Sequence, residues 1–176
     1  SNDTDKNVVV NLSTSLVIEA VAANYQASTH YTKIGETNVT QGIRERNATV
    51  GGEGNGGIIY PKIGWGRDSL AGIVMALNYL AESGKTVSEI VKEYPKFTMI
   101  KDKKTVSSRD DVLPLLDKIE SYFSNSPLDK QDGIKVSLTD SWIQVRPSNT
   151  EPIVRIFVEA PTPEEAEKLM STVQSL

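Results

Sequence analysis

The chain has 176 residues, of which 38% are hydrophobic and 24% are charged, and its formal net charge is −4. These values are typical of a globular protein with one large or two small domains, and they argue against nucleic acid as a partner. The absence of cysteine excludes disulfides and thiolate nucleophiles, and the single histidine, His30, excludes multi-histidine metal sites. No apolar stretch approaches the ~20 residues that a membrane span requires.

A strand, a helix and a second strand are predicted at the start of the chain. The apolar run 7–12 is typical of a buried strand in a parallel sheet. Ser13, Thr14 and Ser15 are good N-cap residues for a helix that follows. The apolar face of that helix consists of Leu16, Val17, Ala20, Val21 and Tyr25. The segment 27–32 indicates a second strand and completes a βαβ unit.

Two consecutive helices are predicted after a weakly helical segment (35–46) and a short strand (58–61). The first helix opens at Arg67-Asp68-Ser69 and stops at Gly84. Its apolar residues recur at helical spacing, which normally faces a core, and they are Leu70, Ile73, Val74, Leu77 and Leu80. The apolar face of the second helix, which Pro95 ends, consists of Val87, Ile90, Val91 and Tyr94.

A change of pattern near 95–102 predicts a boundary between a domain over 1–98 and a domain over 99–176. The second domain opens with a lysine-rich strand at 97–106. We expect the lysines of this strand to form an ordinary solvated edge rather than a phosphate-attracting one, and they are Lys101, Lys103 and Lys104. A helix then starts near Asp110 or Asp111, which places Pro114 in its first turn.

The rest of the second domain predicts three strands and a final helix. The strands are 134–138, 142–145 and 153–159. The helix begins after Thr162, with Pro163 at its first position and Glu165 at capping-box spacing. The order β-α-β-β-β-α describes a small antiparallel α+β domain. The fold class predicted for the chain is therefore α/β followed by α+β.

The first segment that carries chemistry is the glycine loop, Gly52-Glu53-Gly54-Asn55-Gly56-Gly57. It matches G-x-G-x-x-G, but a dinucleotide site requires a helix after the loop, and Ile58-Ile59-Tyr60-Pro61 is not helical. The same residues exclude a Walker A loop, because no Lys-Ser/Thr pair follows the glycines. Glu53, without an obvious basic neighbour, can accept hydrogen bonds from two adjacent sugar hydroxyls. A mobile hairpin turn is the alternative.

The second such segment is the 146–152 loop, Arg146-Pro147-Ser148-Asn149-Thr150-Glu151-Pro152, between two predicted strands. Arg146 offers a planar fork of donors that suits a phosphate, and Ser148 and Thr150 add hydroxyl groups. Successive backbone N–H groups in a tight turn can form an anion-binding nest. These donors favour an oxyanion site, and a β-turn with an exposed Arg146 is the alternative.

The two loops, in this order, resemble those of the α-D-phosphohexomutases, which include phosphoglucomutase, phosphomannomutase and phosphoglucosamine mutase. The 146–152 loop with the strand 153–160 resembles the family's phosphate-binding signature, and the glycine loop resembles its sugar-binding loop. The flanking stretches 32–39 and 66–68 are also similar. The resemblance therefore covers nearly the whole chain.

This resemblance implies part of the family's third domain followed by its fourth, C-terminal domain, which has a fold like that of the TATA-box-binding protein. The family's phosphoserine loop and its magnesium loop, D-G-D-x-D-R, belong to the first two domains and are not found in this sequence. We therefore expect a C-terminal mutase fragment that is inactive alone and has no catalytic residue or metal ligand of its own. The parent enzyme is expected to use Mg²⁺ and a hexose 1,6-bisphosphate intermediate.

The implied reaction interconverts hexose 1-phosphate and hexose 6-phosphate through a phosphoserine enzyme. By resemblance, the residues that bind the non-reacting phosphate are Arg146, Ser148, Asn149, Thr150 and Arg155. Those that bind the sugar are Glu53, Gly54 and Asn55. Many members have Ser-Gly-His where this chain has Asn55-Gly56-Gly57, so the preferred hexose phosphate and the proton-transferring group stay open.

Two other functions fit parts of the sequence. A stand-alone phosphosugar-binding module without catalysis is the main alternative, and a nucleic-acid-binding C-terminal unit is disfavoured by the sequence pI of about 5.1. The polar start of the chain, 1–7, shows no signal-peptide pattern, so we expect a cytoplasmic protein without a membrane partner. The oligomeric state stays open.

Overall fold

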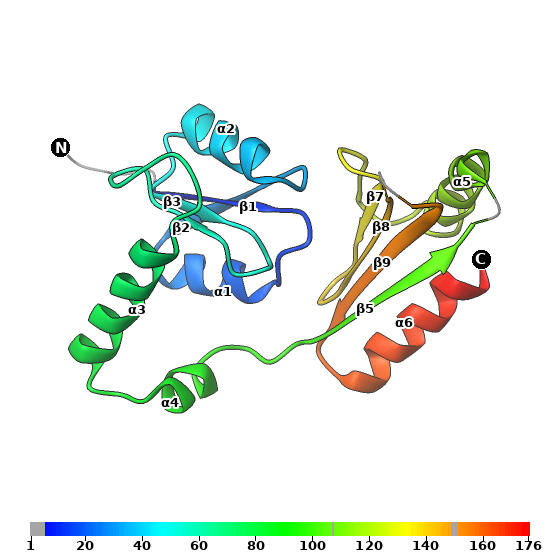
Figure 1. Ribbon diagram of the computed structural model, residues 1–176. Coiled ribbons are helices and arrows are strands. Elements are labelled where there is room, and N and C mark those ends of the chain that lie inside the picture. Colours follow the sequence, from blue (N-terminus) through cyan, green and yellow to red (C-terminus); the bar gives the residue numbers. More distant parts are fainter. Residues whose placement is uncertain (1–5, 107, 149–150) are drawn as a thin grey trace. The chain divides into compact units, whose positions relative to one another are not determined.

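The chain divides into two compact units, Ser1–Lys96 and Phe97–Leu176. The computed structural model describes residues 6–106, 108–148 and 151–176 (Figure 1). Within these ranges no helix combines the length and the apolar character that crossing a membrane requires. The mixed sheet of the first unit and the antiparallel sheet of the second confirm the predicted fold class.

The first unit is built on a four-stranded sheet in the order β2-β1-β3-β4. The central strand β1 (Lys6–Asn11) pairs in parallel with β2 (Ala27–Thr32) and with β3 (Val50–Gly52). The short strand β4 (Ile58–Ile59) pairs antiparallel with β3. Three parallel strands therefore end at the same edge of the sheet, where the segments that follow them meet.

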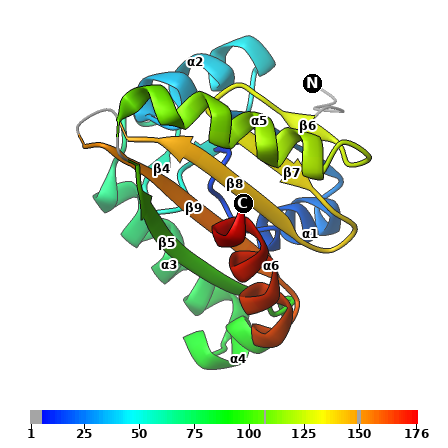
Figure 2. The same cartoon turned by 90° about the vertical axis from the view of Figure 1, so that its right-hand side faces the viewer.

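Two helices cover opposite sides of this sheet (Figures 1 and 2). Helix α1 (Val17–Asn24) connects β1 to β2, which confirms the predicted βαβ unit, and α2 (Glu36–Arg46) connects β2 to β3. The connection from β1 to β2 and the connection from β2 to β3 run across the sheet in opposite directions. Right-handed crossovers therefore place the two helices on different faces of the sheet. The residues buried together between α2 and the sheet are Val9, Val39, Ile43, Ala48 and Ile59.

The start of α1 differs from the prediction. Its N-cap residue is Leu16, which makes no side-chain capping bond, and Ser15 Oγ accepts only from the backbone N–H of Val17. The Ser13 N–H and the Thr14 hydroxyl instead donate to Asn11 Oδ1, over 3.2 and 3.0 Å. The segment of predicted capping residues thus forms a turn at the end of β1, because the Asn11 side chain accepts hydrogen bonds from the backbone N–H and hydroxyl groups that follow it.

The apolar face predicted for α1 is only half-buried. Ala22 is the buried residue of the helix, whereas Tyr25, predicted on the apolar face, is its C-cap residue and is 56% exposed.

Helix α3 (Ser69–Ser83) has the predicted ends but an exposed apolar face. The Asp68 side chain caps its start by accepting from the Ala71 N–H, and Gly84 ends it with a left-handed φ of 65°. The helix packs on β4 near its start, where Gly72 approaches the Ile58 side chain. Four residues of the predicted face are more than half exposed, and they are Leu70, Ile73, Val74 and Leu77.

Helix α4 (Val87–Lys92) follows at once and shows the same partial burial. A capping box joins Thr86 and Glu89 at its start. Ile90 is buried, but Val87 and Val91 of the predicted face are exposed. Helical periodicity therefore identified both helices, although it does not show how much of each face is covered.

The second unit is an antiparallel five-stranded sheet in the order β5-β9-β8-β7-β6. The strands are β5 (Thr98–Thr105), β6 (Leu128–Asp129), β7 (Ile134–Ser137), β8 (Trp142–Pro147) and β9 (Ile153–Ala160). The two-residue strand β6 was not predicted, because a strand this short has no readable alternation. It adds an edge strand to the expected β-α-β-β-β-α order.

Helices α5 (Val112–Tyr122) and α6 (Pro163–Ser175) cover one face of this sheet (Figure 2). A 3₁₀ turn, Arg109–Asp111, precedes α5, and Pro114 lies in the first turn of the helix as predicted. The Thr162 hydroxyl caps α6 by accepting from the Glu165 N–H. Both helices therefore start at the residues that the capping and proline rules indicate.

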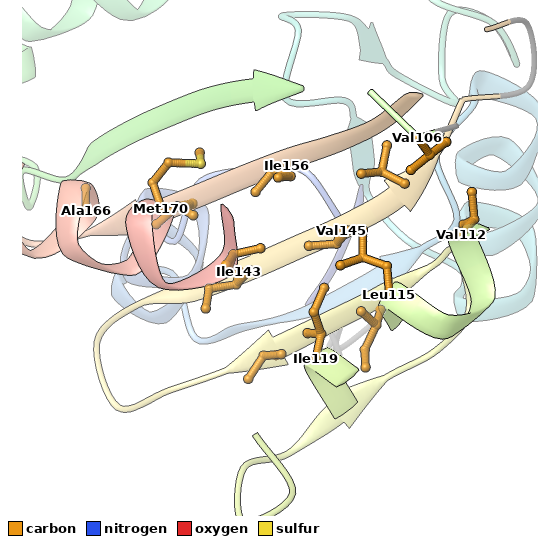
Figure 3. Packing of buried hydrophobic residues seen from close by; sticks show 14 of the residues in the cluster. Val106, Val112, Leu115, Ile119, Ile143, Val145, Ile156, Ala166 and Met170 are labelled. Carbon is orange, nitrogen blue, oxygen red and sulfur yellow. The ribbon is translucent and has the colours of Figure 1, made fainter. Parts of the chain in front are cut away.

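The core of the second unit lies between these helices and the sheet (Figure 3). Ile119 of α5 and Met170 of α6 pack against side chains of β8 and β9 such as Ile143 and Ile156. Side chains alternate between the two faces along a strand, so the strand residues between these core residues lie on the face of the sheet away from the helices.

Replacing a core residue of α5 should cost far more than replacing an exposed residue of the same helix. We expect Ile119→Ala to lower the free energy of unfolding of the second unit by about 2–5 kcal/mol, because the fully buried side chain leaves a cavity. Leu113→Ala, at a position 68% exposed, should change it by less than about 0.5 kcal/mol. Urea unfolding followed by Trp142 fluorescence in a Trp65→Phe background measures both. Equal losses would contradict this packing.

Candidate functional site

A buried carboxylate lies at the edge where the three parallel strands end. The Glu53 side chain, which follows β3, is 5% exposed. Its Oε1 accepts from Asn11 Nδ2, at the end of β1, over 3.0 Å, and from the Gly35 N–H, after β2, over 3.1 Å. The carboxylate therefore joins the segments that follow all three strands. This edge of a parallel sheet is the usual place for a ligand.

Arg67 supplies the cation next to this carboxylate. Its Nη1 lies 3.3 Å from Glu53 Oε2, so the expectation that Glu53 has no basic neighbour was wrong. Arg67 also donates to Glu36, through Nε over 2.8 Å and through its backbone N–H over 2.9 Å. Arg67 lies 14 residues after Glu53 in the sequence, and the turn between β4 and α3 brings it back to the loop. Local sequence pattern does not reveal such a pair.

The same contacts shift the titration of Glu36. Hydrogen bonds from the backbone N–H of Arg67, and next from its side chain, hold the pKa of the Glu36 carboxyl below its usual value. A lowered pKa means that the stabilising contribution is present above the ordinary pKa and is lost as the pH falls through the lowered one. At neutral pH the Glu36 carboxylate is therefore charged where it contacts Arg67.

The glycine loop is held by its own backbone and by the turn after β1. The Glu53 N–H donates to the Gly57 carbonyl over 2.9 Å, and Gly56 has a left-handed φ of 94°. A Cβ at Gly52 would collide with the Gly57 carbonyl oxygen, and one at Gly54 would collide with the Ser13 carbonyl oxygen. These close approaches and hydrogen bonds favour an ordered loop over a mobile turn.

The loop offers a ligand two kinds of polar group. Asn55 is exposed, and its Oδ1 accepts from the Gly57 N–H over 3.1 Å. The Glu53 carboxylate has about four acceptor positions, of which Asn11, Gly35 and Arg67 use three. The arrangement can therefore accept a hydrogen bond from a ligand hydroxyl at a carboxylate whose position is already fixed.

The 146–152 loop joins β8 to β9 in the second unit. The Ser148 N–H donates to the Ile153 carbonyl over 2.9 Å, and the Val106 N–H, just after β5, donates to the Pro152 carbonyl over 3.1 Å. Ser148 is 9% exposed. The predicted site residues Asn149 and Thr150 lie outside the described residues. Three strands thus hold the two ends of the loop.

Arg146 has a buried donor that needs an acceptor. Its Nε is fully buried and has no hydrogen-bond partner among the described residues. Arg146 is paired across the β8–β9 ladder with Arg155, an exposed cation. Buried donors in proteins are nearly always satisfied, and like charges at opposite positions repel. An anion bound at this place would relieve both conditions.

A hollow of about 310 Å³ lies beside the 146–152 loop. The residues that line it are Val112, Leu113, Pro147, Ser148, Glu151, Pro152 and Ile153. It gives a ligand access to the buried Ser148 side chain.

Sequence reasoning missed Asn11 and Arg67 as members of the first site. Asn11 carried one signal, since a polar residue that ends an otherwise apolar strand stands at the ligand-binding edge of a parallel sheet. Arg67 was noted only as the start of a helix.

In the described ranges, no group of three or more His, Asp or Glu side chains lies together in a way that could hold a metal ion.

Two family models match the chain. The one described as "Phosphoglucomutase/phosphomannomutase, alpha/beta/alpha domain III" matches residues 1–97. The one described as "Phosphoglucomutase/phosphomannomutase, C-terminal domain" matches residues 80–175. The glycine loop falls in the first match and the 146–152 loop in the second.

The names of the curated relatives refer to different sugars. Phosphoglucomutase/phosphomannomutase of Thermococcus kodakarensis is 34% identical over 165 residues, which cover 93% of this chain and 36% of the relative. A probable phosphoglucosamine mutase of Methanopyrus kandleri is also 34% identical, and the match covers 92% of this chain and 36% of the relative. The chain therefore spans about 36% of the length of these relatives.

A solved structure with the same fold is N-acetylphosphoglucosamine mutase of Aspergillus fumigatus in complex with GlcNAc-6P and magnesium. It superposes with a TM-score of 0.67 at 16% identity, covering 97% of this chain and 38% of that chain. At this identity the similarity shows the fold.

The close approach of Gly54 to the Ser13 carbonyl oxygen gives a test of the loop. We expect Gly54→Ala to lower the free energy of unfolding of the first unit by about 1–3 kcal/mol, because a backbone atom blocks the added Cβ. Gly64→Ala is the matched control, since nothing lies within 4 Å of its Cβ position. Hydrogen exchange of the β1 and β2 amides measures both variants. Equal protection in the two would contradict the packing of the loop on this turn.

Proposed function

The chain belongs to the phosphoglucomutase/phosphomannomutase family, and we propose that it is the sugar- and phosphate-binding part of a phosphohexomutase. The reaction of the whole enzyme in this proposal interconverts a hexose 1-phosphate and a hexose 6-phosphate. The chain's role is to hold the substrate by the phosphate that does not react and by ring hydroxyls. Positioning of this kind supplies much of the catalysis in phosphoryl transfer.

The observation that carries the proposal is the unsatisfied Nε of Arg146 at the start of the 146–152 loop. A phosphate oxygen is a strong acceptor for a guanidinium donor, and the planar fork of Arg146 suits it. Ser148 adds a hydroxyl and Arg155 adds a second cation on the neighbouring strand. A site of this kind binds a phosphate whichever carbon of the sugar carries it.

Glu53 is the group that we assign to the sugar hydroxyls. Its buried carboxylate is held by Asn11 and Gly35, so little freedom is lost when a hydroxyl donates to it. Asn55 lies on the exposed side of the loop and Gly54 lets the backbone come close to a ligand. The chain's part in this proposal is binding and orientation. The phosphoryl-transferring group and a metal ion would come from another part of the enzyme.

Loss of the Arg146 guanidinium should abolish phosphosugar binding. We expect Arg146→Ala to weaken binding of glucose 1-phosphate by about 10- to 100-fold or more, because the charge-assisted hydrogen bonds are lost. Calorimetric titration with glucose 1-phosphate, mannose 1-phosphate and glucosamine 1-phosphate measures this loss. The rank order of the three identifies the preferred sugar. Equal binding by Arg146→Ala and the unmodified chain would refute the assignment.

Substitution of Glu53 should separate sugar recognition from phosphate recognition. We expect Glu53→Gln to weaken binding of glucose 1-phosphate by about 10-fold while the affinity for inorganic phosphate stays the same, because in this proposal the hydroxyls are the only groups of the ligand that the carboxylate contacts. Glu45→Gln, an exposed change on α2, is the control. Phosphorus NMR titrations with both ligands measure this. A parallel loss for the two ligands would count against the proposed division of roles.

A further inference from the structure

Three cations occupy directly paired positions on three neighbouring strands of the second unit. Lys103 of β5 is paired with Arg155 of β9, and Arg155 is paired with Arg146 of β8. We call these three residues the cationic row. Neighbouring strands lie about 4.8 Å apart, so the row spans about 10 Å.

The three side chains lie on the face of the sheet away from α5 and α6. On β8 and β9 the residues that alternate with Arg146 and Arg155, such as Val145 and Ile156, belong to the core under the helices. On β5, Lys104 Nζ donates to the Gln174 carbonyl of α6 over 2.9 Å, which places Lys104 on the helix side. Lys103, its neighbour in the strand, therefore lies on the other face.

A second contact confirms the side of β5 that faces away from the helices. Lys101 Nζ lies 5.7 Å from the centre of the Phe157 ring, and Phe157 is two residues after Arg155 on β9. Lys101 and Lys103 therefore share a face with Phe157 and Arg155.

The cationic row has no carboxylate within it. The ion pairs of Arg67, Lys85 and Lys130 with Glu36, Glu53, Glu93 and Glu120 do not involve the cationic row. Glu159, an acidic residue on the same face of β9, lies four positions from Arg155, or about 13 Å along the strand, and accepts from Trp142 Nε1. Three like charges at opposite positions destabilise a sheet unless an anion lies between them.

The row also lies at the base of the 146–152 loop. Arg146 is the first residue of that loop, and Arg155 follows the loop by three residues. The end of β5 is tied to the loop as well, by the hydrogen bond from the Val106 N–H to the Pro152 carbonyl. The position of Lys103 relative to the loop is therefore fixed by the pairing of β5 with β9 and by this hydrogen bond.

We infer that Lys103 is a further phosphate-binding residue, and that the cationic row selects the dianionic form of a phosphate monoester. This inference rests on the proposed function, because it uses the same phosphate site. The lysine edge of β5 is then not an ordinary solvated edge at this position. A dianion neutralises two of the three cations, whereas a carboxylate or a phosphodiester neutralises one.

The test compares two lysines of the same strand that lie on opposite faces. Calorimetric titrations with glucose 6-phosphate, and with glucuronate as the singly charged sugar, are made on the unmodified chain and on Lys103→Met, Lys103→Arg and Lys104→Met. We expect Lys103→Met to lower the affinity for glucose 6-phosphate about three- to tenfold. The variants Lys103→Arg and Lys104→Met should change this affinity less than about twofold. Far-ultraviolet circular dichroism and the unfolding midpoint show that each variant is folded.

The outcomes separate this inference from the function on which it rests. Loss of affinity in Lys103→Met alone, with preference for glucose 6-phosphate over glucuronate reduced, supports the inference. Unchanged affinity in Lys103→Met, while Arg146→Ala no longer binds, overturns the inference and leaves the proposed function intact. If the unmodified chain binds no phosphosugar, both are overturned. An equal loss in Lys104→Met would show a general charge effect and would also overturn it.

Discussion

The carboxylate of Glu53 is the point on which the first unit depends. A buried carboxylate without partners costs several kcal/mol, so its place in the sheet is possible only because Asn11 and Gly35 donate to it and Arg67 forms an ion pair with it. Each of these partners comes from a different connection of the sheet. The same hydrogen bonds that make the carboxylate tolerable therefore fix the ends of three strands, and the ligand-binding edge and the fold are stabilised by one group.

In the proposed function, the two units divide recognition by the sign of the charge they present. The first would offer a carboxylate to neutral hydroxyl groups, and the second would offer arginine and lysine to an anion. A sugar phosphate carries both hydroxyl groups and an anionic group. A carboxylate that accepts from the hydroxyls would neutralise the cations that bind the phosphate if the two were side by side. The lack of a carboxylate within the cationic row and the buried position of Glu53 agree with that proposed separation.

Periodicity and turn chemistry were enough to predict nearly every helix and strand, because amphipathic spacing, Thr162, Pro163, Gly84 and Pro114 act locally. They failed where spacing does not show which partner a polar group takes. The Ser13 N–H and the Thr14 hydroxyl donate to Asn11 and form a turn where a helix cap was predicted, and Arg67 reaches Glu53 across a turn. The exposed stripe of α3 shows a further limit, since spacing records which residues share a face and not whether that face is covered. The sequence motifs identified both loops, but only the three-dimensional structure shows the partners of Glu53.

In the proposed function, the tight backbone of the glycine loop also restricts how sugar preference can diverge among descendants of this protein. Side chains cannot be added at Gly52 or Gly54 without moving a neighbouring carbonyl group, and Gly56 has a conformation that side chains rarely adopt. Change at Glu53 would remove the acceptor that joins three strands. Position 55, where the side chain is exposed, is left as the place at which mutation can be explored at low cost. Over positions 52 to 56, evolutionary drift and library design in the laboratory are therefore concentrated on a single residue.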